Sequence, residues 1–473
     1  MTPGTLYYGD CLEWMDRWDD ECVDLIYLDP PFNSKTNYNI LYSAESAGDA
    51  QMRAFADTWQ WDEAAGERMA RFEGAVAHPL HDTICGLFRI LGPSGMMAYL
   101  SYMAERLLPT RRLLKPTGSI YLHCDPTASH YLKVLMDAIY GPKNFRNEII
   151  WYYYNKMHDY RKKLFPAATD TLLFYVRDLQ ADFYYSQLTE PRDKPVRQLV
   201  RRKRNGRMVN ARDEDGNLLY QTKTDRTLDN VWRIPCLQPA SKERLGYPTQ
   251  KPLALLERVI RASSREGDVV LDPFCGCGTA VEAAHRMGRQ WVGIDISPFA
   301  VDLIRNRRLK DMKVPAEGIP NSLASARMLA RERPFAFETW AVTRIPGFAP
   351  NQKQRNDGGI DGRGKLADKP EDMNSRLALA QVKGGTFSAS SFRDFQHVLH
   401  RDKAAIGCFL TLEPAPASAR ADAKRFGTLT VSGYRYDRLH AYSMRDYFAG
   451  STPQLPAMLD PYTGKPMHQM ELF

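Results

Sequence analysis

The feature that most constrains the fold is an alternation of short apolar runs with helical segments, on both sides of a basic middle region. Residues 23–28 and 118–125 are apolar runs typical of buried strands, whereas 104–114 and 128–141 have helical periodicity. The second half of the alternation consists of an expected helix 248–264, strand 268–274, helix 280–287 and strand 290–296. Strands that alternate with helices predict an α/β fold, in which helices cover both faces of a parallel sheet.

A chain of 473 residues is too long for one ordinary hydrophobic core, so we expect two or three domains. No apolar segment reaches the roughly 18 residues that a membrane span needs, and the N-terminus has no secretory signal. The eight cysteines are scattered without a CxxC pair, which favours a reducing compartment over disulfides or a zinc site. These features predict a cytoplasmic protein without membrane contact.

Residues 151–230 break the α/β rhythm and hold much of the positive charge. They contain 16 Lys and Arg against 11 Asp and Glu, which is +5 of the net charge of +8. A charge run is often only a solvated surface, but basic residues interleaved with aromatics also suit phosphate contacts and base stacking. The residues alone leave both interpretations open. The candidate DNA-binding residues are Lys194, Arg197, Arg201, Arg202, Lys203, Arg204 and Arg207.

Two motifs follow expected strands at distant positions in the chain. In Asp29-Pro30-Pro31-Phe32, a carboxylate and two prolines without N–H groups end an apolar run. In the turn Gly276–Gly278, glycines follow a strand, and Asp295 ends the next strand at a spacing that suits ribose hydroxyls. The carboxyl ends of parallel strands share one crevice, so we expect a nucleoside-like cofactor beside a planar base that carries an amino group.

Each of these motifs also has a simpler interpretation. A glycine pair after a strand fits a tight turn without a ligand, and the third glycine of a dinucleotide site is absent. Cys275 and Cys277 have no second thiol pair, so we expect them to line the turn rather than bind metal. His123, at the end of an expected strand, is interpreted as a structural histidine.

Taken together, residues 5–312 resemble the β class of S-adenosylmethionine-dependent DNA amino-methyltransferases. The matching segments are YYGDCLEWM, DLIYLDPPFNS, LLKPTGSIYLHCDPTASHYLKVLMDAIYG, YPTQKPLALLERVI and DVVLDPFCGCGTAVEAAHRMGRQWVGIDIS. The resemblance implies a Rossmann-like methyltransferase sheet with an inserted DNA-recognition region at about 150–235, which favours DNA contact by the basic residues. In this family, aspartate before Pro-Pro favours adenine N6 as the methylated atom, and cytosine N4 stays open.

The resemblance also implies roles for individual residues. The catalytic motif would be Asp29, Pro30, Pro31 and Phe32. Asp10 would meet the adenine of the cofactor and Asp295 its ribose, while residues 249–252 would close over its methionine end. The implied cofactor-binding residues are Asp10, Thr249, Gln250, Lys251, Asp272, Phe274, Gly276, Gly278, Thr279 and Asp295.

The C-terminal part carries a different pattern. Asp361 follows two glycines, and Gln381 and Lys383 alternate on an expected strand, so they share one face. Such groups suit a Mg²⁺ ion with a lysine beside the attacking water, although Gln-x-Lys on an exposed strand is common. Residues 333–435, with FETW, GGIDG and QVK, resemble the Mrr-type branch of the PD-(D/E)xK nucleases. The resemblance implies metal ligands at Asp361 and Gln381, a further ligand at Glu338, and Lys383 as the water-positioning residue, with Asp357 as an alternative to Asp361.

The expected organisation is a methyltransferase domain at 1–312, a linker at 313–330 and an α/β endonuclease-like domain at 331–473. The resulting hypothesis is a single-chain restriction–modification protein that acts on double-stranded DNA with S-adenosylmethionine and Mg²⁺. Three alternatives stay open: a solitary methyltransferase with an inactive, DNA-binding nuclease-like tail, a non-enzymatic DNA-binding regulator, and the modification subunit of a multi-subunit restriction system. The sequence does not give the oligomeric state, and a homodimer is one option.

Overall fold

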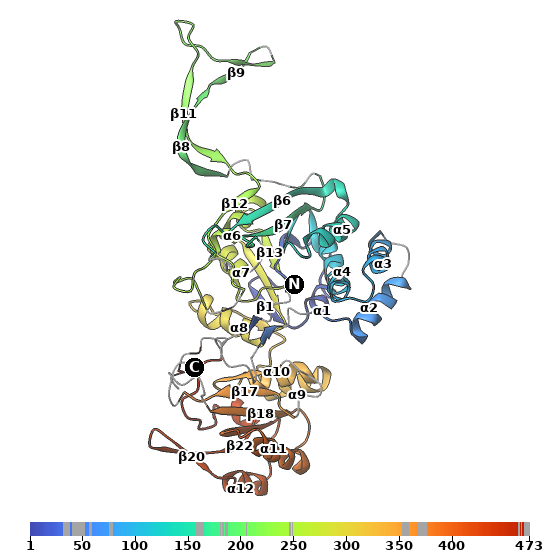
Figure 1. Ribbon diagram of the computed structural model, residues 1–473, viewed down its shortest axis with the longest axis vertical. Helices are drawn as coiled ribbons and strands as arrows, with labels where there is room; N and C mark the ends of the chain where they lie inside the picture. The colour runs from blue at the N-terminus through green and yellow to red at the C-terminus, as the bar shows by residue number, and fades with distance from the viewer. Residues whose placement is uncertain are drawn as a thin grey trace.

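A central sheet, a long arm at one end and a second sheet at the other end make up the molecule (Figure 1). The computed structural model describes residues 1–31, 38–39, 53–55, 59–74, 79–156, 165–179, 181, 184, 188–204, 206–245, 247, 249–351, 359–367, 376–461, 464 and 466–467. Among these residues, no helix has both the length and the apolar character that a bilayer crossing requires.

The central sheet has nine strands in the order β12-β6-β7-β5-β2-β13-β14-β1-β15. All neighbouring strands are parallel except where β7 pairs with β5 and β6, so β7 is the reversed strand. Its strands are β1 (Thr5–Tyr8), β2 (Val23–Leu28), β5 (Leu114–Cys124), β6 (Phe145–Tyr152), β7 (Thr169–Val176), β12 (Val231–Arg233), β13 (Val269–Asp272), β14 (Gln290–Asp295) and β15 (Ala316–Glu317).

Helices cover both faces of this sheet, as the alternation of strands and helices predicts. In β2, Leu25 and Tyr27 belong to the core formed with α6, α7 and α8, whereas Ile26 and Leu28 belong to the core formed with α1 to α5. The helices of the first core are α6 (Leu253–Ser263), α7 (Thr279–Arg286) and α8 (Pro298–Leu303), followed by a π-helical turn at Ile304–Arg308. Those of the second are α1 (Cys11–Met15), α2 (Glu63–Glu73), α3 (Pro79–Leu91), α4 (Gly95–Leu113) and α5 (Ser129–Tyr140), followed by a 3₁₀ turn at Pro142–Asn144.

Most expected elements are confirmed, with shifted boundaries. The expected helix 128–141 is α5, which ends before Gly141 (φ +86°), and the expected strand 290–296 is β14. The expected helix 248–264 begins only at Leu253, with Pro252 as its N-cap, and residues 249–252 are not helical. The expected strand 118–125 begins earlier, at Leu114, directly after α4.

The basic middle region forms an arm that projects from the central sheet (Figure 1). Its shaft is the antiparallel pair β8 (Thr189–Leu199) and β11 (Tyr220–Thr227), and a branch consists of β9 (Arg201–Arg204) and β10 (Arg207–Asn210). Three backbone hydrogen bonds close the junction. The Val200 N–H donates to the Leu219 carbonyl at 2.9 Å, and the Leu219 N–H donates to the Ala211 carbonyl at 2.9 Å. The Ala211 N–H donates to the Val200 carbonyl at 2.7 Å. This ring of hydrogen bonds splits the arm into two branches.

The second sheet has the order β16-β17-β18-β19-β22. β17 is antiparallel to both of its neighbours, β16 and β18, whereas β18, β19 and β22 are parallel to one another. The strands are β16 (Phe348–Pro350), β17 (Gly362–Lys365), β18 (Leu377–Lys383), β19 (Ile406–Thr411) and β22 (Leu439–Ser443), and the helices are α9 (Leu323–Glu332), α10 (Pro334–Val342), α11 (Ala389–Arg401), α12 (Ala417–Arg425) and α13 (Met444–Phe448). Two small hairpins complete the described elements: β3 (Tyr38–Asn39) with β4 (Arg53–Phe55), and β20 (Thr428–Val431) with β21 (Tyr434–Asp437).

The segment 313–330 differs from the expected linker. Its strand β15 joins the edge of the central sheet beside β1, and α9 begins at Leu323 with a capping box on Ser322. Ala326 and Leu329 are buried in a core that also contains Leu6 of β1. The Tyr8 hydroxyl donates to the Ala336 carbonyl at 3.1 Å. The two sheets are therefore joined by packed elements rather than by a free tether.

Candidate active site

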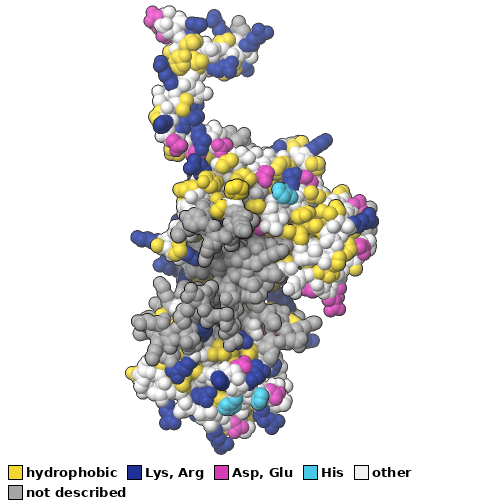
Figure 2. All heavy atoms as spheres, viewed as in Figure 1, with side chains coloured by type: hydrophobic (Ala, Val, Ile, Leu, Met, Phe, Trp, Pro, Cys, Tyr) yellow, Lys and Arg dark blue, Asp and Glu magenta, His cyan; other side chains and the backbone are white. Residues whose placement is uncertain are grey.

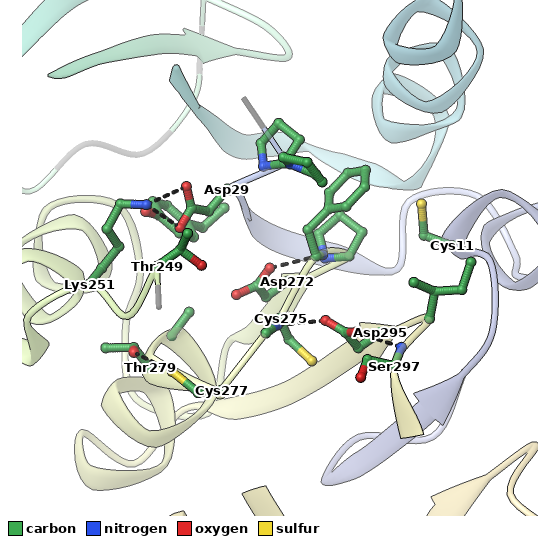
Figure 3. A pocket seen from close by; sticks show the side chains of 18 of the residues that line it. Cys11, Asp29, Thr249, Lys251, Asp272, Cys275, Cys277, Thr279, Asp295 and Ser297 are labelled. Atoms are coloured by element: carbon green, nitrogen blue, oxygen red, sulfur yellow. Dashed lines mark hydrogen bonds and ion pairs between the residues drawn. The ribbon is translucent and has the colours of Figure 1, made fainter. Parts of the chain in front are cut away.

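A pocket that is partly open to solvent lies at the carboxyl ends of β1, β2, β13 and β14 (Figure 3). Asp29, Pro30 and Pro31 line it from the end of β2, and Phe274 and Gly276 line it from the turn after β13. The two motifs thus share one pocket, as the parallel sheet predicts. Phe32 lies outside the described residues.

The two glycines of the turn pack closely against Tyr247 and Ile304. Gly276 has φ +49°, and a Cβ there would lie 3.2 Å from the ring of Tyr247. Gly278 has φ +76° at the N-cap of α7, and a Cβ there would lie 2.6 Å from Ile304. Both positions therefore require glycine, for their left-handed backbone and for lack of space. The result is a tight turn that leaves its backbone open to the pocket.

Two carboxyl groups lie beside this turn: Asp272, which is buried, and Asp295, which is half-buried. The Asp295 carboxylate accepts hydrogen bonds from the backbone N–H groups of Gly276 at 2.7 Å and Ser297 at 2.8 Å. Burial raises the pKa of Asp295 to about 6, although these two hydrogen bonds oppose the shift. Burial also raises the pKa of Asp272 well above its usual range, and the nearby Asp29 and Asp295 add to the effect.

Asp29 is held by a lysine from the opposite wall of the pocket. The Lys251 ammonium donates to both carboxylate oxygens of Asp29, at 2.7 and 2.6 Å (Figure 3). The two side chains are 9% and 16% exposed, so the pair is largely shielded from water. Lys251 precedes α6, and its sequence motif suggested a cofactor contact. Its ammonium bonds Asp29, and the residue also lines the pocket.

A polar network lies behind Asp29. His123 is fully buried, and its Nδ1 lies 2.8 Å from the Tyr27 hydroxyl and 4.0 Å from an Asp29 oxygen. Its Nε2 lies 3.3 Å from Asp170, which also accepts from the Tyr153 hydroxyl at 3.3 Å. Burial alone would raise the pKa of Asp170, but the hydrogen bond and charge of His123 outweigh it and lower the pKa. The network supports the wall that carries Asp29.

The remaining expected cofactor residues also line the pocket, and two of them, Asp10 and Gln250, are already hydrogen-bonded to other parts of the protein. Asp10 caps α1 by accepting from the Leu12 N–H at 3.0 Å, and its other oxygen accepts from the Arg106 guanidinium. Gln250 holds its own loop, because its side chain accepts from the Leu245 N–H at 2.8 Å and donates to the Glu243 carbonyl at 2.7 Å. The other lining residues among the expected set are Thr249, Phe274 and Thr279.

In the second sheet, Asp361, Gln381 and Lys383 lie on or beside neighbouring strands. Asp361 N–H donates to the Ala380 carbonyl at 2.9 Å, and the Asp361 carboxylate accepts from the Val382 N–H at 2.7 Å. Gln381 is 7% exposed, and its Oε1 is buried without a hydrogen-bond partner among the described residues. Glu338 lies on α10, and Asp357 lies outside the described residues. Within the described part of the chain, no group of three His, Cys, Asp or Glu side chains could hold a metal ion.

All seven candidate DNA-binding residues lie on the arm and are exposed to solvent. Lys194 and Arg197 lie on the shaft, where the Arg197 guanidinium stacks 4.4 Å above the Tyr220 ring. The other five lie on the branch β9–β10. Dark blue side chains gather on this branch in Figure 2. Within the described residues, these five form no ion pair with an acidic side chain.

Residues 23–306 match the sequence model of the N6_N4_Mtase family, described as DNA methylase. The match covers more than half of the chain, so this protein belongs to that DNA methylase family. Type II methyltransferase M.HpaI of Haemophilus parainfluenzae is 31% identical over 209 residues, which are 44% of this chain and 59% of that protein. Type II methyltransferase M2.MboI of Moraxella bovis is 20% identical over 308 residues, which are 64% of this chain and 86% of that protein.

Two solved structures are also similar to this chain. PvuII DNA methyltransferase (cytosine-N4-specific) has a TM-score of 0.40 at 15% identity, with 64% of this chain and 85% of that chain covered. The M1.HpyAVI–SAM complex has a TM-score of 0.35 at 17% identity, with 64% of this chain and 98% of that chain covered. Both TM-scores lie below 0.5, so the family membership rests on the sequence match.

The Lys251–Asp29 pair provides a test of stability. We expect Lys251→Met to lower the free energy of unfolding by about 3 kcal/mol, because it leaves a mostly buried carboxylate without its cation. Arg425 is a control, since it pairs with Asp422 at 3.4 Å and the two side chains are 80% and 57% exposed. Arg425→Met should cost at most about 1 kcal/mol. Urea-induced unfolding measures both, and adding Asp29→Asn to Lys251→Met should recover part of the loss. Equal costs for Lys251→Met and Arg425→Met would contradict this account of the pair.

Proposed function

We propose that this chain transfers a methyl group from S-adenosylmethionine to the exocyclic amine of a base in double-stranded DNA, with adenine N6 as the expected target. The observation that carries the proposal is the shared pocket, in which Asp29-Pro30-Pro31 faces the Gly276–Gly278 turn and Asp295. Membership of the DNA methylase family supports the same reaction class. The match to M.HpaI spans 59% of that protein, so the activity of the whole chain is part of the proposal.

The residues present fit a nucleoside-containing methyl donor. The turn at Gly276 leaves no Cβ between the backbone and Tyr247, and Asp295 offers a carboxylate to ribose hydroxyls. When bound, S-adenosylmethionine would supply an electrophilic methyl group. Asp10, Thr249 and Phe274 would complete the walls around it.

On the other side of the pocket, Asp29 and the Pro30 carbonyl would accept the two hydrogens of the amine. Lys251 takes one lone pair from each Asp29 oxygen, and each oxygen keeps another that can accept from the base. These hydrogen bonds would orient the nitrogen lone pair toward the methyl group. A base must leave the duplex to reach such a pocket. The protein's contribution is then alignment in a site shielded from water.

Removing the Asp29 carboxylate tests the catalytic assignment. We expect Asp29→Ala to reduce methyl transfer from labelled cofactor to DNA at least about a hundredfold, because the amine loses its acceptor. Cofactor affinity, measured by calorimetry, should change far less. Asp19→Ala, which alters an exposed carboxylate outside the pocket, is the control and should leave both values unchanged. Undiminished turnover in Asp29→Ala would refute the role of Asp29.

The raised pKa of Asp295 gives a pH test of the cofactor site. An ionised carboxylate accepts from ribose hydroxyls, so affinity should be full by about pH 8. It should fall as the pH drops through about 6, where Asp295 takes up a proton. Asp295→Asn should bind more weakly and show no step near pH 6. Calorimetric titrations of S-adenosylmethionine from pH 5 to 8 measure both. A wild-type affinity that is flat across this range would contradict the assignment.

A second candidate function is Mg²⁺-dependent DNA cleavage by residues 331–473. The observation that favours it is the buried Oε1 of Gln381, which has no hydrogen-bond partner among the described residues, on the strand whose Ala380 and Val382 backbone bonds Asp361. A carbonyl oxygen and a carboxylate are ligands that Mg²⁺ accepts. The order of α10, the antiparallel strands β16 to β18, α11 and the parallel strand β19 suits the resemblance to PD-(D/E)xK nucleases. Asp361 and Gln381 would hold the ion, which would activate a water that Lys383 positions.

Lys383→Ala tests this second function. We expect wild type to cleave DNA with Mg²⁺ and Lys383→Ala to lose cleavage at least about a hundredfold, while methyl transfer stays unchanged. Lys310→Ala, on an exposed residue outside both sites, is the control. Methylated and unmethylated plasmids should be compared in parallel, because the preference for modified DNA is open. Wild type that cleaves neither plasmid would leave the solitary methyltransferase with a DNA-binding tail as the better description.

A further inference from the structure

One wall of the pocket lies where the methylase part meets the C-terminal unit, residues 331–473. Gly9 and Asp10 form the turn from β1 to α1, Asp295 and Ser297 form the turn from β14 to α8, and all four residues line the pocket. The Gly9 N–H donates to the Asp295 carbonyl at 3.0 Å, which ties the two turns together. This adenosine wall would meet the adenine of the cofactor through Asp10 and its ribose through Asp295.

Arg333 of the C-terminal unit packs against the first of these turns. It is the N-cap of α10, and its guanidinium donates to the Glu13 carboxylate of α1 at 3.2 Å. A Cβ on Gly9 would lie 2.6 Å from the same guanidinium, so Arg333 lies directly on the Gly9 backbone. One residue earlier in β1, the Tyr8 hydroxyl donates to the Ala336 carbonyl of α10 at 3.1 Å. Two contacts from α10 therefore hold the turn between β1 and α1 (Figure 1).

Arg344 of the C-terminal unit holds the second turn through α8. Its guanidinium donates to the Asp302 carboxylate, and the two side chains are 13% and 23% exposed. Asp302 lies on α8, whose N-cap is Ser297, and the Ser297 N–H donates to the Asp295 carboxylate at 2.8 Å. Because α8 has only six residues and is about 9 Å long, a shift at Asp302 also moves the Ser297 end.

The two arginines differ in how they contribute. Arg344 and Asp302 form a mostly buried pair, and removing one partner of such a pair leaves the other charge uncompensated. The Arg333 and Glu13 side chains are 28% and 49% exposed, so their charge pair is weaker and the packing on Gly9 adds to it. Neither arginine lines the pocket itself. Both therefore act on a bound cofactor only through the residues that they hold.

We propose that Arg333 and Arg344 are positioning residues for the cofactor, so that the C-terminal unit completes the S-adenosylmethionine site of the methylase part. This inference rests on the proposed function and deepens it, because it gives the C-terminal unit a role in methyl transfer that does not depend on DNA cleavage. The arginines fix the adenosine wall before the cofactor binds, which lowers the cost of ordering that wall on binding. By linkage, the bound cofactor must stabilise the contacts of α10 to the same extent.

A charge exchange across the first contact tests the proposal. Arg333→Glu places two carboxylates together and should raise the Kd and the KM for S-adenosylmethionine about fivefold, with kcat at saturating cofactor unchanged. Glu13→Arg should have the same effect, because it places two guanidinium groups together. The double variant restores opposite charges and should return both values to within about twofold of wild type. Calorimetry gives the Kd, and methyl transfer to DNA gives KM and kcat.

The second contact is tested at Arg344. Arg344→Met should weaken cofactor binding about tenfold or more, and Arg344→Lys, which keeps the charge, should recover part of the loss. Hydrogen–deuterium exchange adds a measurement that does not depend on turnover. In wild type, S-adenosylmethionine should slow the exchange of the α10 amides. This protection should shrink in Arg333→Glu and return when Glu13→Arg is added.

Controls and contrary outcomes separate this proposal from the proposed function. Arg420→Glu reverses an exposed charge on α12, at the far end of the C-terminal unit, and should leave Kd, KM and kcat unchanged (Figure 1). Thermal unfolding checks that every variant is folded. Unchanged affinity in the single variants, no recovery in the double variant, or a fall in kcat without a rise in KM would overturn the positioning role. Wild type that binds S-adenosylmethionine but methylates no DNA would instead refute the proposed function, and the Kd values would still decide the positioning role.

Discussion

The parallel pairing of β2 with β13 decides where the pocket forms. Leu25 pairs with Val270 and Ile26 with Leu271, so segments from opposite ends of the methylase part lie side by side and run in the same direction. Asp29 and Phe274, which follow these strands, must then emerge at the same edge of the sheet. Lys251 adds a third distant segment by pairing with Asp29 across 222 residues of sequence. A reversed pairing would have placed the two motifs at opposite edges.

Three carboxyl groups in one pocket would repel one another if all were ionised and unpaired, and the structure gives each a different compensation. Asp29 is paired with Lys251, and Asp295 is bonded by two backbone N–H groups. Burial raises the pKa of Asp272 well above its usual range, and its carboxyl accepts a hydrogen bond from the Phe274 N–H at 3.1 Å. One wall of the pocket therefore carries the Asp29 carboxylate bonded to Lys251, and the other carries the Asp295 carboxyl bonded to backbone N–H groups.

Strands and helices that are encoded by local sequence patterns could be predicted from the sequence. The apolar runs of β2 and β14 and the glycine that ends α5 are local signals, and the structure has these elements within one residue of the expected bounds. Two partners were not predictable, because they depend on tertiary contacts. The Lys251 ammonium bonds the Asp29 carboxylate, and the Gln250 side chain bonds the backbone of its own loop. The arm was also missed as a structure, since its exposed strands lack the apolar alternation that marks a half-buried sheet. A signal for the network behind Asp29 was present: Asp170 is a carboxylate within the apolar strand β7.

The packed junction between the two sheets has a consequence for how such a protein can be assembled in evolution. Ala326 and Leu329 of α9 and Phe337 of α10 share a core with Leu6 and Tyr8 of β1. A recombination event that exchanged the C-terminal unit at residue 312 would bring foreign helices against that surface and leave apolar side chains unmatched. The contacts of α9 and α10 with β1 are kept if both units are inherited together, or if only residues beyond α10 are replaced. The shared core therefore ties the descent of the two units together more strongly than a flexible tether would.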